Sequence, residues 1–263
     1  MDLQQLCEDV CQLARKTGKF LRTEVNKLSA AEVEIKGVND FVSYVDKTSE
    51  KLIIEELQRL LPEAGFIAEE KTNTTKGDKY NWIVDPLDGT TNYIHGLPCY
   101  SVSIALAEND EIIIGVVYEV NLDECFYAFK GSKAFLNGKE IVVSDRAKVS
   151  DALVATGFPY YDYSDLGRYM ELFTYFLKNS HGIRRLGSAA VDLAYVACGR
   201  FEAFFEYGLN PWDVAAGAFI IEQAGGKVYD FCGGNNYIFG KQIVASNSML
   251  AEEFSGIIKS VFP

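Results

Sequence analysis

Hydrophobic residues follow two different patterns along the chain, and this division limits the possible folds more than any other feature. Between residues 65 and 155, short apolar runs separated by Gly, Asn and Asp predict strands, the clearest at 66–69, 81–85, 101–107 and 111–120. From residue 166 onward the pattern alternates, with helices expected at 166–178, 189–198 and 212–224 and strands at 182–185 and 203–207. Such alternation predicts a second sheet flanked by helices. We therefore expect an α+β chain with two sheet regions.

The N-terminal part shows helical periodicity followed by a hairpin signal. Apolar residues recur at steps of three and four from residue 3, which predicts an amphipathic helix to about Lys27. Two strand-like runs, 33–36 and 41–45, flank a turn at 37–40 and predict a β-hairpin.

A second helix is expected to begin at Asp46 and to end before Pro62, and its predicted apolar face carries Leu52, Ile53, Leu57 and Leu60. The most loop-like segment is 71–79, and the chain contains no internal repeat, linker or low-complexity tract. We expect residues 1–263 to form one domain whose two packed sheet regions cover about 1–155 and 156–263.

Composition and charge exclude several classes of function. The chain has 25 Lys and Arg against 37 Asp and Glu, a net charge of −12, which predicts repulsion from nucleic acid and from anionic membranes. No apolar run approaches the roughly 18 residues of a membrane span, and the N-terminus lacks signal-peptide features, so we expect a cytoplasmic protein. With two histidines and neither a CxxC pair nor a GxSxG motif, a typical zinc site and a nucleophilic serine are not expected. The six cysteines are expected to be reduced core thiols.

Segment 81–92, NWIVDPLDGTTN, combines an apolar strand with carboxylates and a helix start. The strand is expected to end at Asp85 because Pro86 stops strand pairing, and Asp88 then opens a helix. Carboxylate oxygens suit Mg²⁺, and free N–H groups at a helix start bind phosphate oxygens. The alternative is structural: Asp88 caps the helix and Asp85 completes a turn.

Two further acidic elements follow the same design. Glu69 and Glu70 come directly after an apolar strand, and because adjacent strand residues point to opposite faces, at most one can face the aspartates. Asp213 lies in NPWDVAAG, at the start of an apolar helix. Solvated glutamates and a capping Asp213 are the alternatives. Together the three acidic elements predict a shared divalent-cation site.

These motifs carry a family resemblance. WIVDPLDGTTNYIHG, the upstream AEE, and NPWDVAAG followed by AGG make the chain similar to the inositol monophosphatase family over nearly its whole length. The segment RRLGSAAVDLAYVACGRFEAFFEYGLNPWD resembles bacterial members in particular. The resemblance implies the layered α-β-α-β-α sandwich of the sugar phosphatase superfamily and a metal-dependent phosphomonoesterase activity.

The resemblance also implies metal ligands. Glu69 matches a metal ligand that orients the attacking water, and Asp85 and Asp88 match metal-bridging carboxylates. Leu87 matches a residue that offers its backbone carbonyl, and Asp213 completes the shell of a second metal. Asp46 matches an aspartate near a third, weaker metal, although an N-cap role suits it equally. Ser43 replaces a more usual threonine, and the 71–79 loop is short, but neither change removes a ligand.

Other matched residues contact water, phosphate and sugar. Thr90 corresponds to the hydroxyl that helps Glu69 position the water, and the N–H groups of Gly89 and Thr90 would bind phosphate oxygens. The residues expected at the sugar ring are Asp88, Gly187, Ser188, Ala189, Glu206 and Asp213.

The implied reaction is attack of a metal-activated water on a small phosphomonoester. Because the substrate brings about two negative charges to a protein of net charge −12, two or three Mg²⁺ ions are expected to supply the neutralisation. The resemblance further implies a homodimer and inhibition by Li⁺. Inositol 1-phosphate is the expected substrate; the alternatives are fructose 1,6-bisphosphate, a 3′-phosphonucleotide, NADP(H) and histidinol phosphate.

Two hypotheses from outside the superfamily fit less well. A haloacid-dehalogenase-type phosphatase would carry DxDGT, whereas one more residue separates Asp85 from the glycine here and Pro86 follows the would-be nucleophile. A module in which the acidic clusters only stabilise the fold would have no need of the phosphate- and sugar-contacting residues.

Overall fold

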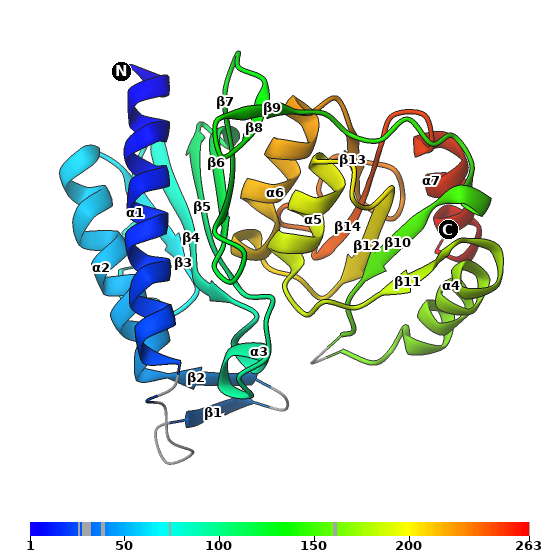
Figure 1. Ribbon diagram of the computed structural model, residues 1–263, viewed down its shortest axis with the longest axis horizontal. Helices are drawn as coiled ribbons and strands as arrows, with labels where there is room; N and C mark the ends of the chain where they lie inside the picture. Colours follow the sequence, from blue (N-terminus) through cyan, green and yellow to red (C-terminus); the bar gives the residue numbers. More distant parts are fainter. Residues whose placement is uncertain (26, 28–32, 38–39, 74, 160–161, 263) are drawn as a thin grey trace.

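The computed structural model describes residues 1–25, 27, 33–37, 40–73, 75–159 and 162–262, and its strands form two large sheets and one hairpin (Figure 1). The seven-stranded sheet has the order β3-β4-β5-β6-β7-β8-β9, and its strands are Gly65–Ala68, Tyr80–Asp88, Ser101–Glu108, Glu111–Glu119, Glu124–Phe129, Ala134–Leu136 and Lys139–Ile141. β3 runs parallel to β4, and the later neighbours pair in antiparallel fashion.

The five-stranded sheet has the order β11-β10-β12-β14-β13. Following the chain from β10 to β14, its strands are Leu153–Thr156, Gly182–Arg184, Ala203–Tyr207, Lys227–Tyr229 and Gln242–Ser246. β10 is parallel to β11 and β12, whereas β14 is antiparallel to β12 and β13. A short 3₁₀ helix, Val149–Asp151, precedes this sheet.

Helices cover both sheets and fill the space between them (Figure 1). α1 (Leu3–Glu24) and α2 (Tyr44–Leu60) pack on the outer face of the seven-stranded sheet. α5 (Ala189–Ala197) and α6 (Pro211–Gln223) lie between the sheets. α4 (Leu166–Asn179) and α7 (Ala251–Val261) pack on the far side of the five-stranded sheet. The expected α-β-α-β-α sandwich is therefore confirmed.

Most element boundaries agree with the sequence expectation, and the differences have local causes. α1 ends at Glu24 rather than Lys27. α2 begins at Tyr44, so Asp46 lies in its first turn and is not the N-cap. Leu52 is 38% exposed, because the buried stripe of α2 follows Ile53 and Leu57, and Leu52 lies about 100° around the helix from Ile53.

The hairpin is confirmed as β1 (Val33–Gly37) paired with β2 (Asp40–Ser43). The second strand ends at Ser43, before the expected Val45, because α2 has begun. Turn residues 38 and 39 lie outside the described part of the chain.

β4 does not end at Asp85. Asp85 pairs with Ser103 and Asp88 pairs with Ser101, so three steps on β4 oppose two on β5 and a bulge forms between the two aspartates. Proline is tolerated at such a bulge, where a ladder hydrogen bond is missing in any case. Asp88 is the last residue of β4, and the bulge brings Asp85 and Asp88 together at this end of the strand.

The cysteines are unpaired, as expected, but they are not all core residues. Cys7 and Cys125 are buried, whereas Cys232 is exposed. No helix of the described residues has the length and apolar character needed to cross a bilayer.

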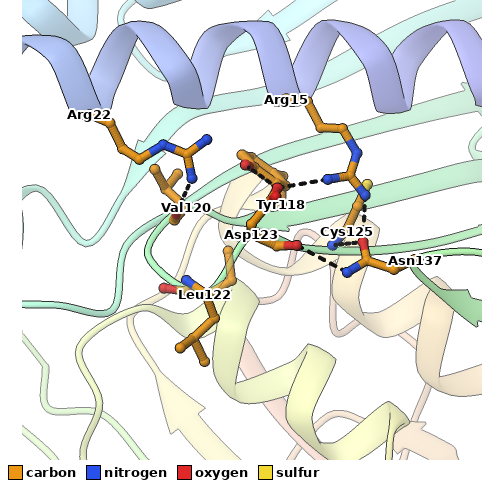
Figure 2. Close-up of polar contacts among 9 residues, drawn as sticks. Arg15, Arg22, Tyr118, Val120, Leu122, Asp123, Cys125 and Asn137 are labelled. Carbon is orange, nitrogen blue, oxygen red and sulfur yellow. Dashed lines mark hydrogen bonds and ion pairs between the residues drawn. The ribbon is translucent and has the colours of Figure 1, made fainter.

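α1 packs closely against Tyr118 of β6 because residue 18 of the helix is a glycine. Figure 2 shows Arg15 and Arg22 of α1 reaching Tyr118 and the turn after β6. Arg15 donates to Asp123 Oδ1 at 2.8 Å, and the Tyr118 hydroxyl donates to the same oxygen at 2.7 Å. The Tyr118 ring is thus held in place, and it lies directly against Gly18, where an added Cβ would overlap it.

We expect Gly18→Ala to lower the free energy of unfolding by about 1–3 kcal/mol, because the helix must move off the sheet. The matched control is Gly256→Ala in α7, where no atom lies within 4 Å of the added Cβ. There the higher helix propensity of alanine should stabilise by about 0.5–1 kcal/mol. Urea denaturation measures both; a stabilising Gly18→Ala would contradict the close contact.

Candidate active site

One cleft draws its lining from both sheet regions. Glu69, Asp88 and Thr90 contribute from the side of the seven-stranded sheet, and Glu206 and Asp213 contribute from the other side. The two sides of the cleft are joined where α6 begins. The hydroxyl of Ser103, which pairs with Asp85 across β5 and β4, donates to the Trp212 carbonyl at 3.0 Å. Residues more than 100 positions apart are thereby brought to one place.

Three carboxylates form the centre of this cleft. Asp85 and Asp88 from the β4 bulge and Asp213 from the first turn of α6 each offer an oxygen, and these oxygens lie within 4.8 Å of one another. Asp85 is 2% exposed and Asp88 is 8% exposed. The predicted convergence of these three acids is confirmed.

Burial raises the pKa values of all three aspartates, and neighbouring carboxylates raise those of Asp85 and Asp213 further. Burial is the largest cause for Asp85, and neighbouring carboxylates, Glu69 foremost, raise its pKa further. Burial also raises the pKa of Asp88, against the hydrogen bonds from Ser188 and Ala190. The pKa of Asp213 rises to about 7 through burial and the charge of Asp88. A compact set of hard oxygen donors that repel one another fits a divalent cation such as Mg²⁺.

The structural roles considered for these aspartates exist alongside the cluster. Asp85 Oδ1 accepts from the Leu87 N–H at 2.9 Å, which completes a turn. Asp213 Oδ2 accepts from the Asn210 N–H at 2.6 Å within a capping box of α6. Capping and clustering are therefore not alternatives, since the backbone bonds orient the carboxylates toward one another.

Asp88 forms hydrogen bonds with a different helix from the one that it was expected to cap. α3 (Thr90–Ile94) has Gly89 as its N-cap, so Asp88 does not cap the helix that follows it. Instead Asp88 Oδ2 accepts from Ser188 Oγ at 2.5 Å and from the Ala190 N–H at 2.8 Å, at the start of α5. This pairing could not be read from sequence spacing because it spans 100 residues.

β3 ends at Ala68, so Glu69 and Glu70 lie in a turn and the expected alternation of strand faces does not apply to them. Glu69 lines the cleft and raises the pKa of Asp85, whereas the Glu70 N–H donates to Glu50 Oε2 at 2.7 Å. Glu50 is fully buried on α2 and also accepts from the Thr72 N–H, so it holds the turn that positions Glu69. Sequence reasoning missed Glu50, although an acid on the buried stripe of a helix was a usable signal.

Thr90 brings two other predicted residues together. Its hydroxyl lies 3.1 Å from Asp46 Oδ1 and 2.9 Å from the Leu87 carbonyl oxygen. A hydroxyl has one proton, so it serves one of these acceptors at a time. Asp46 is buried, which places it inside the site rather than at its surface.

Close backbone approach joins the two halves of the cleft. Gly89 has φ +94°, and an added Cβ would lie 3.1 Å from the Gly187 carbonyl oxygen. Asn92 Nδ2 donates to the Leu186 carbonyl at 2.8 Å and to the Cys99 carbonyl at 2.7 Å. Asn92, which sequence reasoning did not single out, thus fixes the turn that carries Gly187, Ser188 and Ala189.

Glu206 lines the end of the cleft that the five-stranded sheet region forms. It lies on β12, and burial raises its pKa. Gly157 packs against it so closely that an added Cβ would overlap the carboxylate. Arg185 and Asp192 also line this end. Sequence reasoning missed both, although an acid inside the apolar segment 189–198 was a signal.

Comparison with known proteins gives a consistent family match. A profile described as the inositol monophosphatase family matches residues 2–261. An inositol-1-monophosphatase of Mesorhizobium japonicum is 38% identical, with 94% of each chain covered. A fructose-1,6-bisphosphatase/inositol-1-monophosphatase of Thermotoga maritima is 38% identical, with 95% of this chain and 94% of the relative covered.

Two further similarities carry a different name. The Nus factor SuhB of Escherichia coli is 41% identical, with 89% of this chain and 88% of the relative covered. The crystal structure of extragenic suppressor protein suhB from Bartonella henselae superimposes with a TM-score of 0.90 at 40% identity, covering 96% of this chain and 97% of that one.

The raised pKa values predict how stability depends on pH and metal. Each of the three aspartates holds its proton more tightly in the folded than in the unfolded chain. Its contribution to folding is therefore complete below about pH 4 and is lost as the pH rises through the folded pKa, about 7 for Asp213. We expect Mg²⁺ to raise Tm by several degrees more at pH 8 than at pH 5, since it then meets unprotonated ligands.

Differential scanning fluorimetry with and without Mg²⁺ measures this difference. Asp213→Asn keeps an acceptor for the Asn210 N–H but lacks the charge, so its Mg²⁺ increment should be small at both pH values. Equal increments at pH 5 and pH 8 in the unsubstituted protein would contradict the argument.

Proposed function

The chain belongs to the inositol monophosphatase family, and from this premise we propose that it is a Mg²⁺-dependent phosphomonoesterase acting on inositol 1-phosphate or a similar small sugar or polyol phosphate. The family is one of metal-dependent phosphatases; the metal and the substrate are what the proposal adds. The products would be the free polyol and inorganic phosphate.

One observation carries the proposal: the buried carboxylates of Asp85 and Asp88 and the half-buried carboxylate of Asp213 meet within 4.8 Å in a cleft that also contains the Gly89–Thr90 backbone and Glu206. The carboxylates suit a cation, the small residues leave room for a phosphate, and the distant acid suits hydroxyl groups. Metal, phosphate and polyol sites would thus lie in line along one cleft.

We propose the following ligands. Glu69, Asp85, Asp88 and Asp213 would hold two Mg²⁺ ions together with the carbonyl of Leu87, and a third ion would lie near Asp46. Bound Mg²⁺ supplies charge neutralisation for the phosphoryl oxygens and a lower pKa for coordinated water.

The chain's own groups then orient the reactants. The Glu69 carboxylate would accept a proton from the attacking water, with the Thr90 hydroxyl as its second contact. The N–H groups of Gly89 and Thr90 would donate to phosphate oxygens. The turn Gly187–Ala189 excludes water from one side of the phosphate, because it is held against Gly89. In-line attack then releases the polyol on the side of Glu206.

The polyol would contact the opposite end of the cleft. We assign its hydroxyl contacts to the carboxylates of Glu206, Asp213 and Asp88 and to the turn Gly187, Ser188 and Ala189. Ser188 also donates to Asp88, so a change in the position of the polyol would alter the hydrogen bond that orients the Asp88 carboxylate.

The substrate within the superfamily is the least constrained part of the proposal. The name of the Thermotoga maritima relative includes fructose-1,6-bisphosphatase, which keeps that sugar bisphosphate as the main alternative. The Escherichia coli relative is named a Nus factor, a name that states no phosphatase activity. The absence of a nucleic-acid partner, expected from the charge of this chain, stays a prediction. A panel of superfamily substrates ranked by kcat/KM decides between the alternatives.

Three further expectations are part of the proposal. We propose that residues 1–263 act as one functional domain, because the cleft draws on both sheet regions. We propose a homodimer and a cytoplasmic location on the family resemblance and on the charge of −12.

The function is tested by phosphate release from inositol 1-phosphate. We expect activity to fall to background with EDTA and to return with Mg²⁺, because the cleft offers carboxylates and no soft ligand among its described lining residues. Full activity after rigorous chelation would refute the metal-dependent mechanism.

The same assay tests lithium. Li⁺ is close to Mg²⁺ in size but carries half its charge, so we expect it to enter the position completed by Asp213 and to inhibit at about 1 mM or above. Na⁺ at equal ionic strength should inhibit far less because it is too large. Identical curves in LiCl and NaCl would mean that this position does not admit lithium.

Asp88→Asn separates charge from capping. The amide oxygen can still accept from the Ala190 N–H, so we expect an unchanged fold but a kcat lower by about 10²-fold or more. Asp230→Asn is the matched control, since Asp230 accepts backbone N–H groups from Gly234 and Asn236 away from the cleft. A normal kcat for Asp88→Asn would leave Asp88 with the capping role alone.

A further inference from the structure

Asp192 is a buried acid that the roles proposed above leave unused. It lies in the first part of α5, four residues after the N-cap Ser188, and it is 1% exposed. It lines the same cleft as Glu206. Its Oδ1 atom finds no hydrogen-bond partner among the described residues. A buried carboxyl oxygen without a partner is costly, because the water that it binds in the unfolded chain is not replaced.

The charged groups near Asp192 include Glu206 and Arg185, which line the same cleft. After burial, the charge of Glu206 is the largest cause that raises the pKa of Asp192, whereas the charge of Arg185 lowers it. The Arg185 guanidinium lies over the Phe158 ring at 5.7 Å and beside Gly187. Two carboxyl groups and one guanidinium therefore meet beside the turn proposed to contact the polyol.

We propose that Asp192 is a specificity-determining residue whose Oδ1 pairs with a hydroxyl of the polyol, next to the hydroxyl held by Glu206. The proposal rests on the proposed phosphatase function and adds Asp192 to the residues that would contact the polyol.

A hydroxyl suits this position better than other groups. It can donate to a carboxylate and accept from a carboxylic acid, so it pairs with Asp192 in either protonation state. An anionic group would meet two carboxyls against one guanidinium, and a methylene would leave Oδ1 unpaired. A site built to bind a hydroxyl rejects analogues that lack it, because its own buried polar atom then stays unsatisfied.

The test compares inositol 1-phosphate with cyclohexyl phosphate, which has the same ring size but no ring hydroxyls. We expect Asp192→Leu to lower kcat/KM for inositol 1-phosphate about tenfold or more, mainly through KM, and to change cyclohexyl phosphate less than about twofold. Asp192→Asn keeps an acceptor oxygen and should recover inositol 1-phosphate to within about threefold. Glu202→Gln is the matched control, because Glu202 is a buried acid that accepts from the Leu153 N–H away from the cleft.

Equal losses on both esters in a folded Asp192→Leu protein would overturn the specificity role. If that variant does not fold, singly deoxygenated inositol 1-phosphates decide with the unsubstituted enzyme. Two different hydroxyls should each contribute about tenfold, and Glu206→Leu, which has no acceptor oxygen, should remove the sensitivity to one of them. Sensitivity to a single hydroxyl would overturn the proposal. Failure to hydrolyse either ester with Mg²⁺ would instead refute the proposed phosphatase function.

Discussion

Repulsion among Asp85, Asp88 and Asp213 is the constraint on which the rest of the structure depends. Their oxygens lie within 4.8 Å of one another, and Asp85 and Asp88 are almost wholly removed from water. Such a cluster opposes folding unless protons or cations neutralise it, and it would move apart if the backbone allowed. Each acid is held by backbone N–H groups: one in a turn, one at the start of α5 and one in the capping box of α6. The fold therefore maintains a repulsive arrangement that bound protons or a cation neutralise.

The layered architecture explains how this arrangement is held. α5 and α6 lie between the sheets, and their N-termini point at the bulge of β4 (Figure 1). Asn92 and the close approach of Gly89 to Gly187 join the same two regions. A change in the packing of either helix would thus reach the carboxylates directly. The packing of the middle layer therefore determines both its stability and the geometry of the site.

The residues that line the cleft suit different parts of a ligand. At one end the acids are close together and suit cations. At the other end Glu206, Asp192 and Arg185 are spaced around the Gly187 turn and suit neutral hydroxyl groups. A phosphate ester of a polyol matches both ends at once, since its charged and neutral parts are covalently joined.

The sequence by itself determined the two sheet regions, the helices around them, the acidic motifs and the family resemblance, because periodicity and turn residues act over short distances. It predicted that Asp85, Asp88 and Asp213 share a site. Only the tertiary structure decided that Asp88 accepts hydrogen bonds from the start of α5, that Pro86 lies in a bulge, and that Glu50, Asn92 and Asp192 support the cleft. These facts depend on contacts between residues about 13 to about 100 positions apart, whose partners are chosen by packing in three dimensions and leave no local pattern in the chain.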